Sequence, residues 1–158
     1  MKKLLSVFIL IPITFLNVLA ATDYAAIEAA DRFFVKMQHK EICSLWSMLT
    51  EESQRVIAKD IIKADNGEND LTNEVVLNDF ENCGEITQSY WNAYLSAFDP
   101  NTVVNDAAWS IKEASDKNVD ISLMYKTSTK PAILHMYFEN AKWKVGLVES
   151  FWIRKFFD

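Results

Sequence analysis

Residues 131–152 read PAILHMYFENAKWKVGLVESFW, and this stretch decides the fold. Ile133, His135 and Tyr137 share one face of an expected strand, and the residues between them share the other, because strand side chains alternate. A polar turn at 139–142 leads into a second expected strand. Both faces of this hairpin are largely apolar, so both need cover. We expect helices to cover one face, and sheet curvature or a partner chain to cover the other.

Two more strands are expected upstream of the hairpin. Apolar and polar residues alternate over 107–112 and over 119–126, and the polar groups at 115–118 and 127–130 have the composition of turns. Residues 22–98 instead repeat their apolar side chains at helical spacing. Helices followed by strands with short turns predict an α+β domain, with N-terminal helices packed on a curved antiparallel β-meander.

Apolar side chains at helical spacing and capping residues also place the individual helices. The first is expected to follow Thr22 or Asp23 as its cap. Its apolar stripe consists of Ile27, Ala30, Phe34 and Met37. A short helix is expected at 41–49, and Thr50 is expected to cap another that runs towards Ile62. Residues 64–70 are the expected loop. The last two helices are expected over 71–80 and 86–98, the second closed by Asp99-Pro100.

Residues 1–20 have the composition of a secretory signal peptide. Lys2 and Lys3 precede an apolar run, and Ala20 is the small residue that a signal peptidase requires. The run is shorter than the roughly 20 residues needed to cross a bilayer, so we expect cleavage, with an uncleaved anchor as the alternative. A single α+β domain at 21–158 then remains, periplasmic or secreted from a bacterial cell, with no membrane span after cleavage.

The charge balance excludes one class of partner. The chain has 16 Lys and Arg residues against 22 Asp and Glu, a net charge of −6, and the excess of acid lies in the helical half. Its field repels phosphate groups. We therefore expect no nucleic acid as a partner, and no anionic lipid bound through the helices.

The order of the elements and three short segments resemble the nuclear transport factor 2-like superfamily, in particular its small secreted bacterial members. The segments are Phe33-Phe34, LWSMLT at 45–50 and FENAKWKV at 138–145. The resemblance implies a curved sheet that helices wrap into a cone, often with an apolar pocket inside. One face of the sheet would line the cone, and the other would meet a second copy in a homodimer. Residues 51–98 are more helical than in many members.

Cys43 and Cys83 are the only cysteines in the chain, and both lie in the part expected to be exported. In an oxidising compartment such a pair predicts a disulfide. The sequence has no CxxC motif and no paired histidines, so no metal site is expected, and no cofactor is nominated.

The two histidines receive different interpretations. His39 lies near the end of the first expected helix, where a cation suits the helix dipole. His135 is either a hydrogen-bonded core histidine or a catalytic base. Isomerases and dehydratases of the superfamily set Asp or His with Tyr inside the cone, for which His135, Tyr125, Tyr137 and Asp120 are the candidates here. Alternation places Asp120 and Tyr125 on opposite faces, so no catalytic set is assigned.

The expected pocket is lined by a mixture of apolar and polar-tipped side chains. The ligand-binding candidates are Phe34, Tyr125, Ile133, His135 and Tyr137. Five tryptophans and ten phenylalanines either stack on ligands or fill the core, and a domain of this size favours the core. The tail FWIRKFFD is rich in aromatic residues, so we expect it to be docked on the domain or on a second chain.

Three functions follow from these features. The favoured one is an exported non-enzymatic domain that binds a small apolar ligand or a protein partner in the cell envelope. A small enzyme of the isomerase or dehydratase type, with its site in the cone cavity, is the second. The third is an envelope inhibitor or immunity-like protein that acts by protein interaction.

Overall fold

Four strands follow one another along the chain and pair in the same order, as the alternating residues predict. The computed structural model describes residues 14–151, with side chains from residue 23 onward. The strands are β1 (Ala107–Ala114), β2 (Asn118–Tyr125), β3 (Ala132–Glu139) and β4 (Lys142–Gly146), all antiparallel. Helices precede this meander, so the predicted α+β class is confirmed.

The helices occupy the segments that carry apolar stripes. They are α1 (Thr14–Gln38), α2 (Glu51–Asp65), α3 (Asn73–Asn82), α4 (Glu85–Ala97), α5 (Asn101–Val104) and α6 (Leu147–Ser150). Two short 3-10 turns, η1 (Ile42–Ser44) and η2 (Trp46–Met48), replace the single helix expected there. Among the described residues, no helix is long and apolar enough to cross a membrane.

Two boundaries differ from the prediction. The cap expected at Thr22 or Asp23 is wrong, because α1 already begins at Thr14 and no Gly or Pro interrupts the chain between these positions. The predicted signal peptide thus lies partly outside the described residues and partly in α1. The last strand is shorter than expected, because the chain turns into α6 after Gly146. The apolar side chains of residues 151–157 also predict an extension of this strand, but Phe151 follows α6 and belongs to no strand. Its ring meets that of Phe98 with centroids 6.5 Å apart, and the rest of the tail, residues 152–158, lies outside the described residues.

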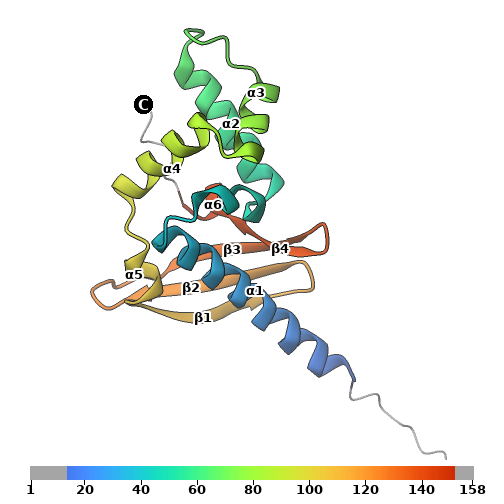
Figure 1. The fold of residues 1–158 in the computed structure, drawn as a ribbon. Coiled ribbons are helices and arrows are strands. Elements are labelled where there is room, and N and C mark those ends of the chain that lie inside the picture. Colours follow the sequence, from blue (N-terminus) through green and yellow to red (C-terminus); the bar gives the residue numbers. More distant parts are fainter. Residues whose placement is uncertain (1–13, 152–158) are drawn as a thin grey trace, which may run out of the picture.

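One face of the sheet forms the floor of the core. α1 crosses this face diagonally, and α2, α3 and α4 stack beyond the β3–β4 side (Figure 1). Six inner-face side chains are at most 1% exposed: Val119, Ile121, Leu123, Leu134, Met136 and Val145. The opposite face carries Ser122, Ile133 and Tyr137, which are only partly buried. The described elements therefore cover one face of the hairpin and leave the other partly open.

Aromatic rings connect the sheet to the helices above it. Phe34 meets Trp109 of β1 with ring centroids 6.1 Å apart, and Phe33 meets Trp91 of α4 at 6.3 Å. At the far end, the rings of Trp46 and Phe80 stack at 3.9 Å. These tryptophans fill the core, as the size of the domain predicts, rather than an exposed stacking surface.

Hydrogen bonds join the start of α2 to the end of β4. Thr50 caps α2 by accepting from the Ser53 amide at 3.0 Å, as predicted, and the Thr50 amide donates to the Val145 carbonyl at 3.0 Å. The hydroxyls of Thr50 and Ser53 both donate to the Glu149 carboxylate, at 2.8 and 2.5 Å. The Val148 amide donates to the Ser53 hydroxyl at 3.1 Å. These partners draw residues 147–150 into α6 and end the strand.

Cys43 and Cys83 form the predicted disulfide, across a sequence separation of 40 residues. The bond ties η1 to the end of α3, so it closes the loop that contains the whole of α2. We predict that replacing both cysteines with alanine lowers the free energy of unfolding by about 3–4 kcal/mol, because the unfolded chain regains the freedom that the loop removes. Urea unfolding of both proteins without reductant measures the loss. A difference below roughly 1 kcal/mol would contradict the prediction.

The Glu149 carboxylate is the acceptor for two hydroxyls. We predict that Glu149→Gln lowers the free energy of unfolding by about 1–2 kcal/mol, because an amide offers one acceptor oxygen in place of two and sets its NH₂ group against a hydroxyl. Glu81→Gln, at an exposed position of α3, is the matched control, with an expected change within roughly 0.5 kcal/mol. Equal effects of the two changes would show that the hydroxyl contacts add nothing to stability.

Candidate functional site

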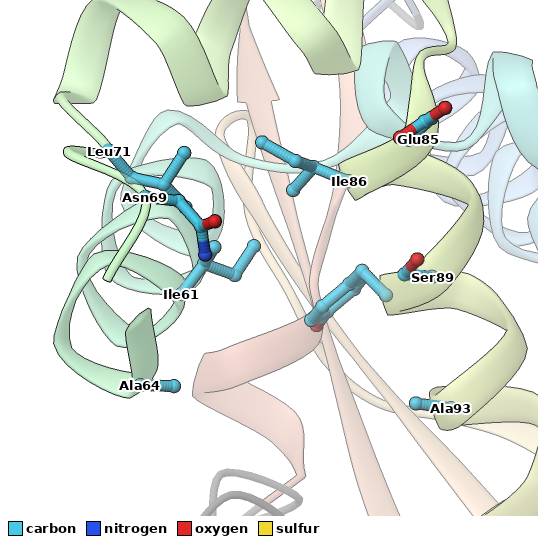
Figure 2. Close-up of a pocket in the computed structure, with 9 residues that line it drawn as sticks. Ile61, Ala64, Asn69, Leu71, Glu85, Ile86, Ser89 and Ala93 are labelled. Carbon is cyan, nitrogen blue, oxygen red and sulfur yellow. The ribbon is translucent and has the colours of Figure 1, made fainter. Parts of the chain in front are cut away.

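An apolar groove of about 520 Å³ lies between α2 and α4. Ile61, Asn69 and Leu71 form one wall, and residues of α4 face them across the gap (Figure 2). The lining residues are Ile61, Ala64, Asn69, Leu71, Glu85, Ile86, Ser89, Tyr90 and Ala93. The groove therefore offers carbon-rich walls with a few polar groups, which is the composition of a small-molecule site.

Local sequence positions each wall. Ile61 and Ala64 belong to the last turn of α2, which ends at Asn66 in the left-handed conformation. The loop then returns, and the Asn69 side-chain amide donates to the Asp65 carboxylate at 2.5 Å. This bond, with one from the Asn69 backbone amide, lowers the pKa of Asp65. The loop is thus held against α2 rather than hanging free.

The α4 wall is positioned by a carboxylate on the neighbouring helix. Asp79 of α3 accepts hydrogen bonds from the backbone amides of Ile86 and Thr87, at 3.2 and 2.7 Å, and from the Thr87 hydroxyl at 2.8 Å. It therefore caps α4 from outside that helix. Gly84 makes this approach possible, because a Cβ there would lie 2.7 Å from the Asp79 Cγ and would overlap the carboxylate. The disulfide at Cys83 anchors the same corner.

Tyr90 supplies the largest ring of the groove. Burial raises the pKa of its phenol, and the nearby Asp60 carboxylate raises it further. The phenol is therefore neutral across the physiological range and serves as a hydrogen-bonding group, not as a charge. Its ring also contacts Phe80 and Trp91, with centroids 5.7 and 5.1 Å apart, so the groove rests directly on the aromatic core.

The five predicted pocket residues divide between the two faces of the sheet. Phe34 is fully buried on the side of α1 that faces the sheet, and Tyr125 lies on the same inner side, where burial raises its phenol pKa. Ile133, His135 and Tyr137 lie on the outer face. The structure therefore does not bring these residues into one pocket.

On the outer face, His135 forms a hydrogen-bonded pair with Asp120. The two residues are cross-strand partners, and His135 Nδ1 lies 2.7 Å from an Asp120 carboxylate oxygen. Their side chains are 32% and 23% exposed, so His135 is neither fully packed nor inside the core. Tyr137 packs over Gly146 on β4, where a Cβ would lie 2.8 Å from its ring. Burial raises the Tyr137 pKa, and the charges of Glu149, Asp120 and Glu139 raise it further.

This outer cluster borders a second hollow of about 330 Å³. Glu113, Asp120 and Tyr137 line it, together with Ser115 of the β1–β2 turn and Asn118 at the start of β2. A carboxylate that orients an imidazole is one element of a general base. Among the described residues, however, no three metal-ligating side chains converge here or elsewhere.

Sequence reasoning missed the groove between α2 and α4. Ile86 and Tyr90 fall in the apolar stripe of the helix expected over 86–98, and Ile61 falls in the helix expected to run from Thr50 towards Ile62. The available signal was the pair of apolar stripes on either side of the 64–70 loop. These stripes predict that the two helices pack together, but they do not predict that a groove remains between them.

Comparisons with known proteins identify no relative from which a function could be inferred. No protein-family model matches the chain, and the searches found no similar curated protein and no similar solved structure.

The Asp79 cap can be tested through the glycine beside it. We predict that Gly84→Ala lowers the free energy of unfolding by about 1–2 kcal/mol, because the added methyl group displaces the capping carboxylate. Asp79→Ala should cost a similar amount, and the double variant should cost less than the sum, since both changes remove the same cap. Denaturant unfolding of the three variants provides the values. Strict additivity would show that Gly84 acts by another route.

Proposed function

We propose that this protein is an exported, non-enzymatic domain that binds a small apolar ligand in the groove between α2 and α4. The observation that carries the proposal is a groove of about 520 Å³ with walls made mainly of Ile61, Leu71, Ile86 and Tyr90. Ligand sites commonly have volumes of roughly 300–1,000 Å³ and predominantly apolar walls.

The contacts that hold the walls of the groove apart support a ligand-binding role rather than a packing defect. The disulfide holds the corner beside α4, and the Asp79 cap fixes the first turn of that helix. On the other wall, Asp65 holds the loop through Asn69. A preformed cavity loses little conformational entropy when a ligand enters.

The few polar groups suit an amphipathic ligand with one polar end. Asn69, Glu85 and Ser89 are exposed at the groove, whereas Ile61, Ile86 and Tyr90 are partly buried. An apolar body would therefore lie against the deeper residues, with a hydroxyl or amide at the mouth. Glu85 disfavours an anionic end, because its carboxylate would repel one.

Export is supported by two independent features. The first is the signal-like composition of residues 1–20, and the second is the Cys43–Cys83 disulfide, which fits an oxidising compartment. We also propose that the sheet and α1 form a variant of the cone of the nuclear transport factor 2-like superfamily. The support is an N-terminal helix laid across one face of an antiparallel four-stranded meander (Figure 1).

Occupation of the groove can be tested with a neutral fluorescent probe and a substitution that fills the space. N-phenyl-1-naphthylamine should gain fluorescence on binding the purified protein, and Ala93→Trp should weaken its binding at least about tenfold, because the indole occupies the groove. Ala97→Trp, at an exposed position of the same helix outside the lining, is the matched control and should leave binding unchanged.

Native mass spectrometry of the protein as purified supplies a second readout, since a retained ligand adds mass. Ala93→Trp should abolish any such adduct, whereas Ala97→Trp should keep it. Equal probe affinity for the two variants, or no probe binding by the unmodified protein, would overturn the proposal.

A further inference from the structure

A second groove, of about 570 Å³, opens where α1 and the η1–η2 turns approach the free side of β4. α1 contributes Arg32 and Lys36, and β4 contributes Lys142 and Lys144 on either side of Trp143. Four basic side chains thus line one groove, in a chain whose net charge is −6. We call it the basic groove.

The basic side chains differ in how far they are already neutralised. Lys36 forms an ion pair with Glu41 at 2.6 Å, and the Lys144 ammonium donates to the Ser47 carbonyl. The side chains of Arg32 and Lys142 are exposed, and among the described residues neither side chain has a hydrogen bond or an ion pair. Burial lowers the pKa of Lys144, and the charge of Lys142 lowers it further. The groove therefore carries more basic than acidic side chains, although Glu28 also lines it and the charges of Glu139 and Glu51 act on Lys144 in the opposite sense.

The backbone of β4 is open at the same place. The Val145 carbonyl points away from β3, towards the edge of β4 that no strand covers. It accepts a hydrogen bond from the Thr50 amide there, at 3.0 Å. Trp143 lies two residues earlier, so its amide and carbonyl also point to the free side. Phe138, the partner of Trp143 on β3, is consistent with this orientation. Its amide donates to the Lys117 carbonyl on the other side of β3 and not to β4. No described residue beyond the sheet pairs with the Trp143 backbone.

We propose that the basic groove receives an extended acidic segment of a partner protein, which adds to the free edge of β4 at Trp143. An unpaired strand edge is a template for another strand, and the main-chain hydrogen bonds supply affinity. The basic side chains on this edge then select segments that carry carboxylates. This surface is separate from the apolar groove between α2 and α4.

The strand geometry specifies the pattern of the segment. Side chains of an added strand alternate in the same way as those of β4, so residues opposite Lys142 and Lys144 lie on one face and the residue opposite Trp143 lies on the other. Acidic residues suit the first two positions. The middle residue faces α1, where Ala25 and Ala29 line the groove beside Trp143, so an apolar side chain suits it. The expected core is acidic–apolar–acidic.

An extended peptide fits these features better than a free anion does. A small carboxylate or phosphate uses donors only, whereas the open edge at Trp143 presents a donor and an acceptor together. Lys144 already lends one donor to Ser47 and retains two for a carboxylate. The rest of the protein is acidic and repels an acidic partner at long range. Binding therefore depends on close contact at this edge, and it weakens as salt is raised.

The experiment uses a fluorescein-labelled peptide, Gly-Ser-Glu-Val-Glu-Val-Glu-Ser-Gly, and fluorescence anisotropy with the full chain. We expect saturable binding that falls at least about tenfold for Lys142→Glu, which places like charges opposite one another. Lys59→Glu, at an exposed position of α2, is the matched control and should bind as the unmodified protein does. A peptide with Lys in place of every Glu should not bind.

Two further peptides and one small anion separate strand addition from charge attraction. A version with N-methylated valines cannot donate main-chain hydrogen bonds and should bind at least about tenfold more weakly. Inorganic phosphate at equal concentration should not displace the first peptide. The proposal is overturned if the N-methylated peptide binds equally well, if Lys59→Glu weakens binding as much as Lys142→Glu does, or if no peptide binds.

Discussion

The hydrogen bonds between the start of α2 and the end of β4 organise the whole structure. Thr50 pairs with Val145 across the strand edge, while Glu149 accepts from the Thr50 and Ser53 hydroxyls. These contacts stop β4 at Gly146 and set the direction of α2. They close the strand edge from Val145 onward and leave it open at Trp143. Both grooves follow from this one junction, because it sets the direction of α2 and the length of exposed strand.

The aromatic core and the disulfide make that junction rigid. Phe33 and Phe34 are fully buried between the sheet and α4. Phe34 contacts Trp109 of the sheet and Phe33 contacts Trp91 of α4, so α1 links the two. Beyond them, the Cys43–Cys83 bond fixes the corner where α3 meets α4. Packed interiors resist small displacements, so the walls of the apolar groove keep their separation without a ligand.

Two surfaces of opposite character lie on separate elements of the fold. The groove between α2 and α4 has carbon-rich walls in the acidic, helical half of the chain, whereas the basic groove lies between α1 and β4. In the roles proposed for them, apolar burial would drive binding at the first, and charge with main-chain pairing would drive it at the second. A domain of this kind suits a role in which a ligand and a protein partner are held at once. The outer-face pair of Asp120 and His135 belongs to neither surface.

Local chemistry was enough to predict much of this protein. The alternation in 107–146, the Thr50 cap and the α+β order depend on neighbouring residues, and the Cys43–Cys83 pair was the one pairing available. Alternation also placed His135 and Tyr137 on a common face, but it did not show which face is buried, since both carry apolar side chains. The tertiary structure decided that Leu134 and Met136 face α1, because they have no polar group that needs a partner. Only the tertiary structure decided where the pairing of β4 ends and where a groove opens between α2 and α4, because both depend on contacts between residues far apart in the chain.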